Sequence, residues 1–266
     1  MLNKVNKNSF AYIETSNHFK KSYQPFSVRL LGERLYIVSA PQDVAMVYKN
    51  SSTFSWDAYL DRLLDAFGLT ADARKLSWTR PEHGQFDDTK MRVINPQSKT
   101  LVHLIEDFYK IQLLPGKQLD IFMGTVLTRL DQSLMWTSMQ GPYVLRSTME
   151  TRKLSMKHLC AHLVTDTTTR AMFGDLIFEF EPDLINYMAV FNAWSWACVF
   201  GVPSIFTPAL SKAKIVLSKA INKYVRTPKH LRHSEAWSIT SIIDAAECFG
   251  MDEESTTAML FMIWWA

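Results

Sequence analysis

The chain has 266 residues, of which 47% are hydrophobic and 12% aromatic, so it can bury a sizeable core and lies outside the disordered range. A formal net charge of +3, without a dense run of Lys and Arg, excludes the strongly basic composition that indicates nucleic-acid binding. The three cysteines, Cys160, Cys198 and Cys248, are far apart in the sequence and lack zinc-site spacing, which favours a reducing compartment.

The first patterned segment predicts a β-hairpin. Two apolar runs, Phe26 to Leu31 and Leu35 to Val38, are joined through Gly32 and Glu33, with glycine first as a tight hairpin turn prefers. Pro41 then opens a short helix, because proline is tolerated where a first-turn amide has no helical partner. We assign residues 1–24 to a polar lead-in and residues 25–266 to one domain, or part of one, since no internal repeat interrupts them.

Most of the remaining chain has helical spacing of its apolar residues. The exception is the stretch 70–99, which has no sustained period and predicts a long ordered loop, either the wall of a site or a plain surface excursion. We therefore expect a mainly α fold with a small β-sheet near the N-terminus. The predicted helices are 57–67, 101–114, 120–135, 154–173, one from Pro182 to about Phe200, and 211–226.

The helix predicted at 211–226 is basic on one side and apolar on the other. Such helices occur on membrane surfaces, and they are also ordinary surface helices of globular proteins. Peripheral membrane contact through residues 201–226 therefore stays open. The first residues lack the continuous apolar segment of a membrane anchor, so we predict no transmembrane segment.

The last stretch, ESTTAMLFMIWWA, is apolar on nearly every face of a helix and must lie inside a larger body. Acidic residues stand before it, as suits the positive end of a helix dipole. It reaches Ala266 without the polar, glycine or basic residues that close a helix. We expect this helix to be cut, with some of its packing partners beyond Ala266. The missing part would also leave apolar faces of the chain bare.

Common catalytic motifs do not occur in the sequence, including glycine-rich phosphate loops, G-x-S-x-G and H-E-x-x-H. His158 and His162 are four residues apart on a predicted helix and could share a metal. Asp166 continues the row, but about 1.5 Å of rise per residue separates it from His158 by roughly 12 Å. A polar helix face is the better interpretation.

Four segments together resemble the amino-terminal half of a cytochrome P-450, a haem-thiolate monooxygenase, of the fungal microsomal type similar to sterol hydroxylases and prostacyclin synthase. The segments are the hairpin followed by SAPQDVAMVYKN, then TTTRAMFGD, FNAWSWACVFGVP and the final MLFMIWWA. The resemblance implies a partial P-450 fold that ends within the central helix, which crosses one face of the haem. It also implies an NADPH-dependent reductase as partner and an apolar small-molecule substrate.

The resemblance implies where the cofactor and the substrate would bind. The family's F-x-x-G-x-x-x-C-x-G loop and E-x-x-R do not occur here, so the thiolate ligand of the iron would lie beyond Ala266 and no catalytic residue is expected in this chain. On the helix that would contact the haem propionates, His103 and Lys110 are the candidate partners. Candidate substrate contacts are Phe86, Trp194, Phe200, Phe261 and Trp264.

Two functions are compatible with these observations. The first is a haem-dependent hydroxylation of an apolar, sterol- or terpenoid-like substrate, for which this truncated chain would be inactive by itself. The alternative is a non-enzymatic α-helical module that binds lipids or a partner protein. Full-length members of the family would place the protein on the cytosolic face of the endoplasmic reticulum membrane, whereas the chain as it stands is also compatible with the cytoplasm.

Overall fold

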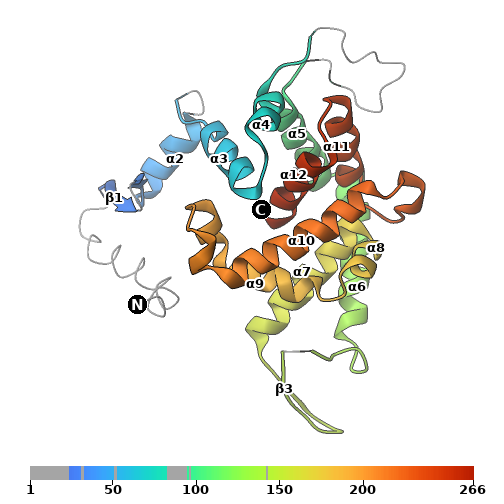
Figure 1. Ribbon diagram of the computed structural model, residues 1–266. Coiled ribbons are helices and arrows are strands. Elements are labelled where there is room, and N and C mark those ends of the chain that lie inside the picture. Colours follow the sequence, from blue (N-terminus) through green and yellow to red (C-terminus); the bar gives the residue numbers. More distant parts are fainter. Residues whose placement is uncertain (1–23, 31–32, 51–52, 83–94, 96, 142) are drawn as a thin grey trace. The chain divides into compact units, whose positions relative to one another are not determined.

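A computed structural model describes residues 24–30, 33–50, 53–82, 95, 97–141 and 143–266 (Figure 1). The chain divides into two compact units, residues 1–60 and 61–266, which are considered separately below. The predicted mainly α fold with a small sheet near the N-terminus is confirmed.

The first unit contains the predicted hairpin. Strand β1 (Phe26–Leu30) pairs in antiparallel fashion with β2 (Glu33–Ile37), and Leu30 lies opposite Glu33. Glu33 was predicted to form the turn, but it is the first residue of β2, and the two turn positions, 31–32, lie outside the described residues. Helix α2 (Pro41–Lys49) follows and begins at the proline as predicted.

The second unit is helical apart from one hairpin. Helix α3 starts at Asp57, just before this unit begins, and has the predicted bounds. The helices, with two 3-10 turns, are α3 (Asp57–Phe67), α4 (Ala71–Trp78), α5 (Leu101–Leu113), α6 (Lys117–Leu134), α7 (Met156–Phe173), α8 (Leu176–Phe180), α9 (Leu184–Val199), η2 (Ser204–Phe206), α10 (Pro208–Arg226), η3 (Lys229–Leu231), α11 (Trp237–Cys248) and α12 (Glu253–Trp265).

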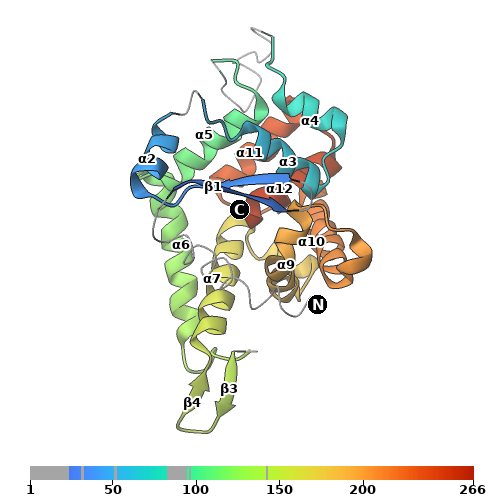
Figure 2. The same cartoon turned by 90° about the vertical axis from the view of Figure 1, so that its left-hand side faces the viewer.

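Several of these elements were not predicted. Helix α4 lies inside the stretch 70–99 that was interpreted as a loop, and the hydroxyl of Thr70 caps it by accepting the amide of Ala73 at 3.2 Å. Helices α8 and α11 were also missed, as was the hairpin of β3 (Val144–Ser147) and β4 (Arg152–Leu154). Figure 2 shows this hairpin extending from the ends of α6 and α7.

Helix α12 is the most deeply buried element of the second unit. It contacts α10 and α11, and every residue from Ser255 to Trp264 is buried. The carboxylate of Asp252 caps its first turn, accepting the amide of Ser255 at 2.6 Å. Residues already present in the chain therefore cover α12, and the apolar side chains that are exposed lie on other elements.

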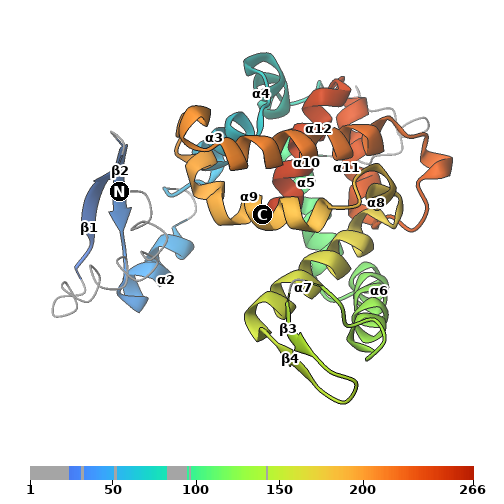
Figure 3. The ribbon, with the colours of Figure 1, turned by 60° about the horizontal axis from the view of Figure 1, so that its bottom comes forward.

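Exposed apolar side chains gather instead on α6, which runs beside α7 (Figure 3). None of the residues of α6 is buried. Leu130 packs against the small core of Tyr143, Leu159 and Leu163, whereas Leu127 on the same helix is 56% exposed.

No described helix combines the length and the apolar character that crossing a membrane requires.

Candidate functional site

Aromatic side chains from α3 and α9 meet those of α12. The ring centroid of Phe261 lies 4.8 Å from that of Phe191 on α9 and 5.1 Å from that of Phe67 on α3. Trp264 lies 6.3 Å from Phe261, a separation within the range of favourable aromatic pairs. We call Phe67, Phe191, Phe261 and Trp264 the aromatic cluster.

Polar contacts fix α12 beside this cluster. The indole Nε1 of Trp264 donates to Oγ1 of Thr169 on α7 at 2.9 Å, and the hydroxyl of Tyr109 on α5 donates to the carbonyl of Ile263 at 2.9 Å. Burial raises the pKa of Tyr109, so the hydroxyl keeps the proton that it donates. Because each polar atom has its partner, these contacts hold α12 at low cost in desolvation.

The candidate substrate residues are only partly brought together. Phe261 and Trp264 both belong to the aromatic cluster, where they are 0% and 8% exposed. Trp194, near the end of α9, and Phe200, just after it, are half-buried, and Trp194 stacks on Trp196. Phe86 lies outside the described residues. The side chains of Phe261 and Trp264 therefore meet neighbouring rings, and a substrate could reach them only if those rings move.

The two candidates for a haem propionate are already engaged. Nδ1 of His103 lies 2.9 Å from Oγ1 of Thr100, and the His103 ring lies edge-on to Trp78. The Lys110 ammonium pairs with Glu106 at 2.8 Å, and this hydrogen bond and charge raise its pKa. A haem propionate would compete with these partners, and the roles of His103 and Lys110 as its ligands stay predictions.

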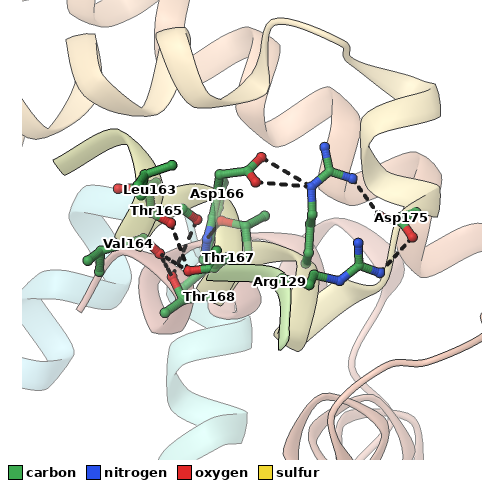
Figure 4. Close-up of polar contacts among 11 residues, drawn as sticks. Arg129, Leu163, Val164, Thr165, Asp166, Thr167, Thr168 and Asp175 are labelled. Carbon is green, nitrogen blue, oxygen red and sulfur yellow. Dashed lines mark hydrogen bonds and ion pairs between the residues drawn. The ribbon is translucent and has the colours of Figure 1, made fainter. Parts of the chain in front are cut away.

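Asp166 on the polar face of α7 belongs to a chain of ion pairs (Figure 4). Arg170 bridges Asp166, at 3.1 Å, and Asp175, at 2.5 Å, and Arg129 of α6 also reaches Asp175 at 2.7 Å. Burial raises the pKa of Asp175, but its hydrogen bonds and charge pairs with the two arginines outweigh this and leave the pKa below its usual value.

The histidines of α7 have other neighbours. Nδ1 of His158 lies 2.9 Å from Oγ of Ser155, and the ring of His162 lies 5.3 Å from that of Tyr143. Across the described ranges no group of three or more His, Cys, Asp or Glu side chains could hold a metal ion.

A cleft between the end of α3, the end of α9 and α10 was not anticipated. It has a volume of about 660 Å³ and is lined in part by Cys198, Thr207 and Lys214. The carbonyl of Ala66 accepts two hydrogen bonds there, from Lys214 Nζ at 2.7 Å and from Cys198 Sγ at 3.1 Å. We call it the α10 cleft. The sequence signal was the lysine row of α10, which had been interpreted only as a surface or membrane face.

A buried cluster of polar side chains links α10 to α11. The hydroxyl of Tyr224 donates to Glu235 at 2.5 Å, and burial, followed by the Glu235 charge, raises the pKa of Tyr224. Thr240 donates to the other oxygen of Glu235 at 2.6 Å. Arg232 is buried beside them, with its Nη1 3.7 Å from Glu235. Both oxygens of the Glu235 carboxylate thus accept a hydrogen bond, and these bonds link α10 to α11.

The first unit has a cleft of its own, of about 540 Å³, between the hairpin and α2. Its aromatic lining is largely exposed: Tyr36 is 70% exposed, Tyr48 71% and Trp56 61%. Three exposed aromatic side chains around one cleft form a larger apolar patch than the single exposed side chains that are normal on a globular protein.

No protein-family model, curated protein or solved structure matches this chain.

Proposed function

We propose that the chain is the amino-terminal part of a haem-thiolate monooxygenase, a cytochrome P-450, that hydroxylates an apolar, sterol- or terpenoid-like substrate. The order of the elements supports the proposal: an N-terminal hairpin, a series of helices, and then α12, which is apolar and buried along its length. This is the order that the sequence resemblance predicts.

In this proposal the chain supplies the apolar scaffold and the propionate candidates His103 and Lys110, and the thiolate ligand of the iron lies beyond Ala266. His103 and Lys110 are engaged with Thr100 and Glu106, and no cysteine of the chain stands in the family's ligand loop. When bound, the haem would supply oxygen activation, with electrons from a reductase partner that oxidises NADPH. The chain's own contribution would be the aromatic cluster and the buried face of α12, which exclude water from an apolar ligand.

Association with the cytosolic face of the endoplasmic reticulum membrane is part of the same proposal. Two apolar side chains of η2, Ile205 and Phe206, are 79% and 61% exposed, and the lysines of α10 follow them directly. Exposed apolar residues next to lysines are typical of peripheral contact with an anionic membrane.

The direct test is the transcript downstream of the Ala266 codon. We expect an in-frame E-x-x-R followed by an F-x-x-G-x-x-x-C-x-G loop. The protein encoded by the full frame, reduced under carbon monoxide, should then give an absorption band of the thiolate type, and the 266-residue chain alone should not. A stop codon with no such remnant, or a thiolate band from the short chain, would contradict the proposal.

The alternative function is a non-enzymatic module for lipids or a partner protein. The observation that favours it is the α10 cleft, whose lining lies entirely within the present chain. Absence of the downstream motifs together with ligand binding by the 266-residue chain would establish the module rather than the enzyme.

A further inference from the structure

The α10 cleft has the size of a small-molecule site. Its volume of about 660 Å³ falls within the usual range of roughly 300–1,000 Å³ for such sites. Val202, Leu210 and Ile215 contribute apolar side chains to its lining. No residue of α12 lines it, so the cleft is separate from the aromatic cluster on which the proposed monooxygenase function depends.

The charge of the cleft is one-sided. Lys214 and Lys219 line it and no carboxylate does. Lys214 forms no ion pair with any described carboxylate, and its one described hydrogen bond goes to the carbonyl of Ala66. An ammonium group has three N–H donors, so Lys214 retains donors for an anion.

The hydroxyl of Thr207, a residue that lines the cleft, lacks a hydrogen-bond partner. Thr207 is 6% exposed and lines the cleft, and its Oγ1 is buried without a hydrogen-bond partner among the described residues. A buried hydroxyl without a partner is destabilising, so a ligand atom that reached Oγ1 of Thr207 would supply the partner that it lacks.

The thiol of Cys198 does not offset the positive charge. Burial raises its pKa, and the nearby Lys214 lowers it by less. Cys198 thus stays neutral and donates to the carbonyl of Ala66. The lining of the cleft therefore combines the ammonium of Lys214 and the hydroxyl of Thr207 with apolar side chains.

We propose that the α10 cleft binds an amphipathic carboxylate of the long-chain fatty acid class. The carboxylate would accept hydrogen bonds from Lys214 and Thr207, and the hydrocarbon chain would lie along Val202, Leu210 and Ile215. Every group named in this proposal belongs to the described residues, and none of them is a haem candidate.

The test is calorimetric titration of the 266-residue chain with oleate below its micelle concentration, and with oleyl alcohol, which lacks the carboxylate. We expect Lys214→Met to weaken oleate binding about tenfold or more and Thr207→Val about threefold, as expected for lost hydrogen bonds to a charged group. Neither variant should change binding of oleyl alcohol. Lys223→Met is the matched control, because Lys223 is exposed on the same helix and does not line the cleft.

Equal oleate affinity in the Lys214→Met and Lys223→Met variants would overturn the proposal, provided that thermal unfolding shows both to be folded. So would binding to anionic phospholipid vesicles with none to monomeric oleate, which would assign the lysines to a membrane surface.

A second measurement uses the cysteines. Oleate should slow alkylation of Cys198 by a maleimide and leave the exposed Cys160 unaffected, as read by mass spectrometry of the peptides. Unchanged alkylation of Cys198 at saturating oleate would place the ligand elsewhere. Either outcome is independent of the downstream-transcript test of the monooxygenase proposal.

Discussion

Helices α12 and α6 belong to the same unit but are stabilised in different ways. Helix α12 buries every side chain from Ser255 to Trp264, whereas no residue of α6 is buried. The α12 side chains meet aromatic rings and satisfied polar partners from several helices, and α6 meets α7 along one face and keeps Leu127 and Leu134 partly in solvent. The stability of α12 thus depends on dry packing, and that of α6 on partial burial and surface charge.

The largest expected difference is in packing. Phe261→Ala removes a ring that is 0% exposed and leaves a cavity between Phe67 and Phe191, so we expect a loss of about 3–5 kcal/mol in the free energy of unfolding. Leu127→Ala on α6 is the matched control, and it should cost less than about 1 kcal/mol because that side chain is half in solvent. Urea denaturation measures both. Similar losses in the two variants would mean that α12 is not the core of the unit.

The next effect is a buried hydrogen bond. Thr169→Val keeps the branched shape but leaves Nε1 of Trp264 buried without an acceptor, which should cost about 1–3 kcal/mol. Thr165→Val is the control, since the Thr165 hydroxyl bonds only its own helix at the carbonyl of Ala161. In combination with Trp264→Phe, the loss from Thr169→Val should shrink. Additive losses would show that the two side chains do not interact.

A smaller effect comes from the helix cap of α12. Asp252→Ala removes the carboxylate that accepts the amide of Ser255 and should lower stability by about 1 kcal/mol. Asp252→Asn keeps the acceptor and should retain most of that contribution. If the asparagine variant loses as much as the alanine variant, the interaction of the charge with the helix dipole is the dominant contribution instead.

The smallest expected effect on stability comes from the ion pair that links α6 to Asp175, and it should depend on pH. Arg129 ties α6 to Asp175, whose pKa is lowered in the folded chain. A lowered folded pKa contributes stability that is fully present above the unfolded value, near pH 4, and is lost as pH falls through the folded value. Because Asp175 is 56% exposed, solvent screening keeps the effect of Asp175→Asn at pH 7 below about 1 kcal/mol.

The measurement is the difference in unfolding free energy between wild type and Asp175→Asn at several pH values. It should vanish below the folded pKa of Asp175 and shrink at high salt. A difference that persists in acid would assign the role of Asp175 to packing rather than charge.

Local sequence patterns predicted most of the helices but missed α11, which has 12 residues, and several shorter elements. The bounds of α3 and the proline start of α2 follow from local signals, and both are confirmed. Helix α4 has only eight residues and few apolar ones, so its signal was the cap at Thr70 rather than a hydrophobic period. The β3–β4 hairpin was missed because its strands, of four and three residues, are too short to show alternation.

The sequence by itself determined that the fold is mainly helical and that the last helix is buried, because a helix that is apolar on every face has no stable position in water. Only the tertiary structure decided which rings meet Phe261 and which side chains, Cys198 and Lys214, meet the carbonyl of Ala66 in one cleft. These contacts join residues far apart in the chain, and local spacing carries no information about which helix faces which.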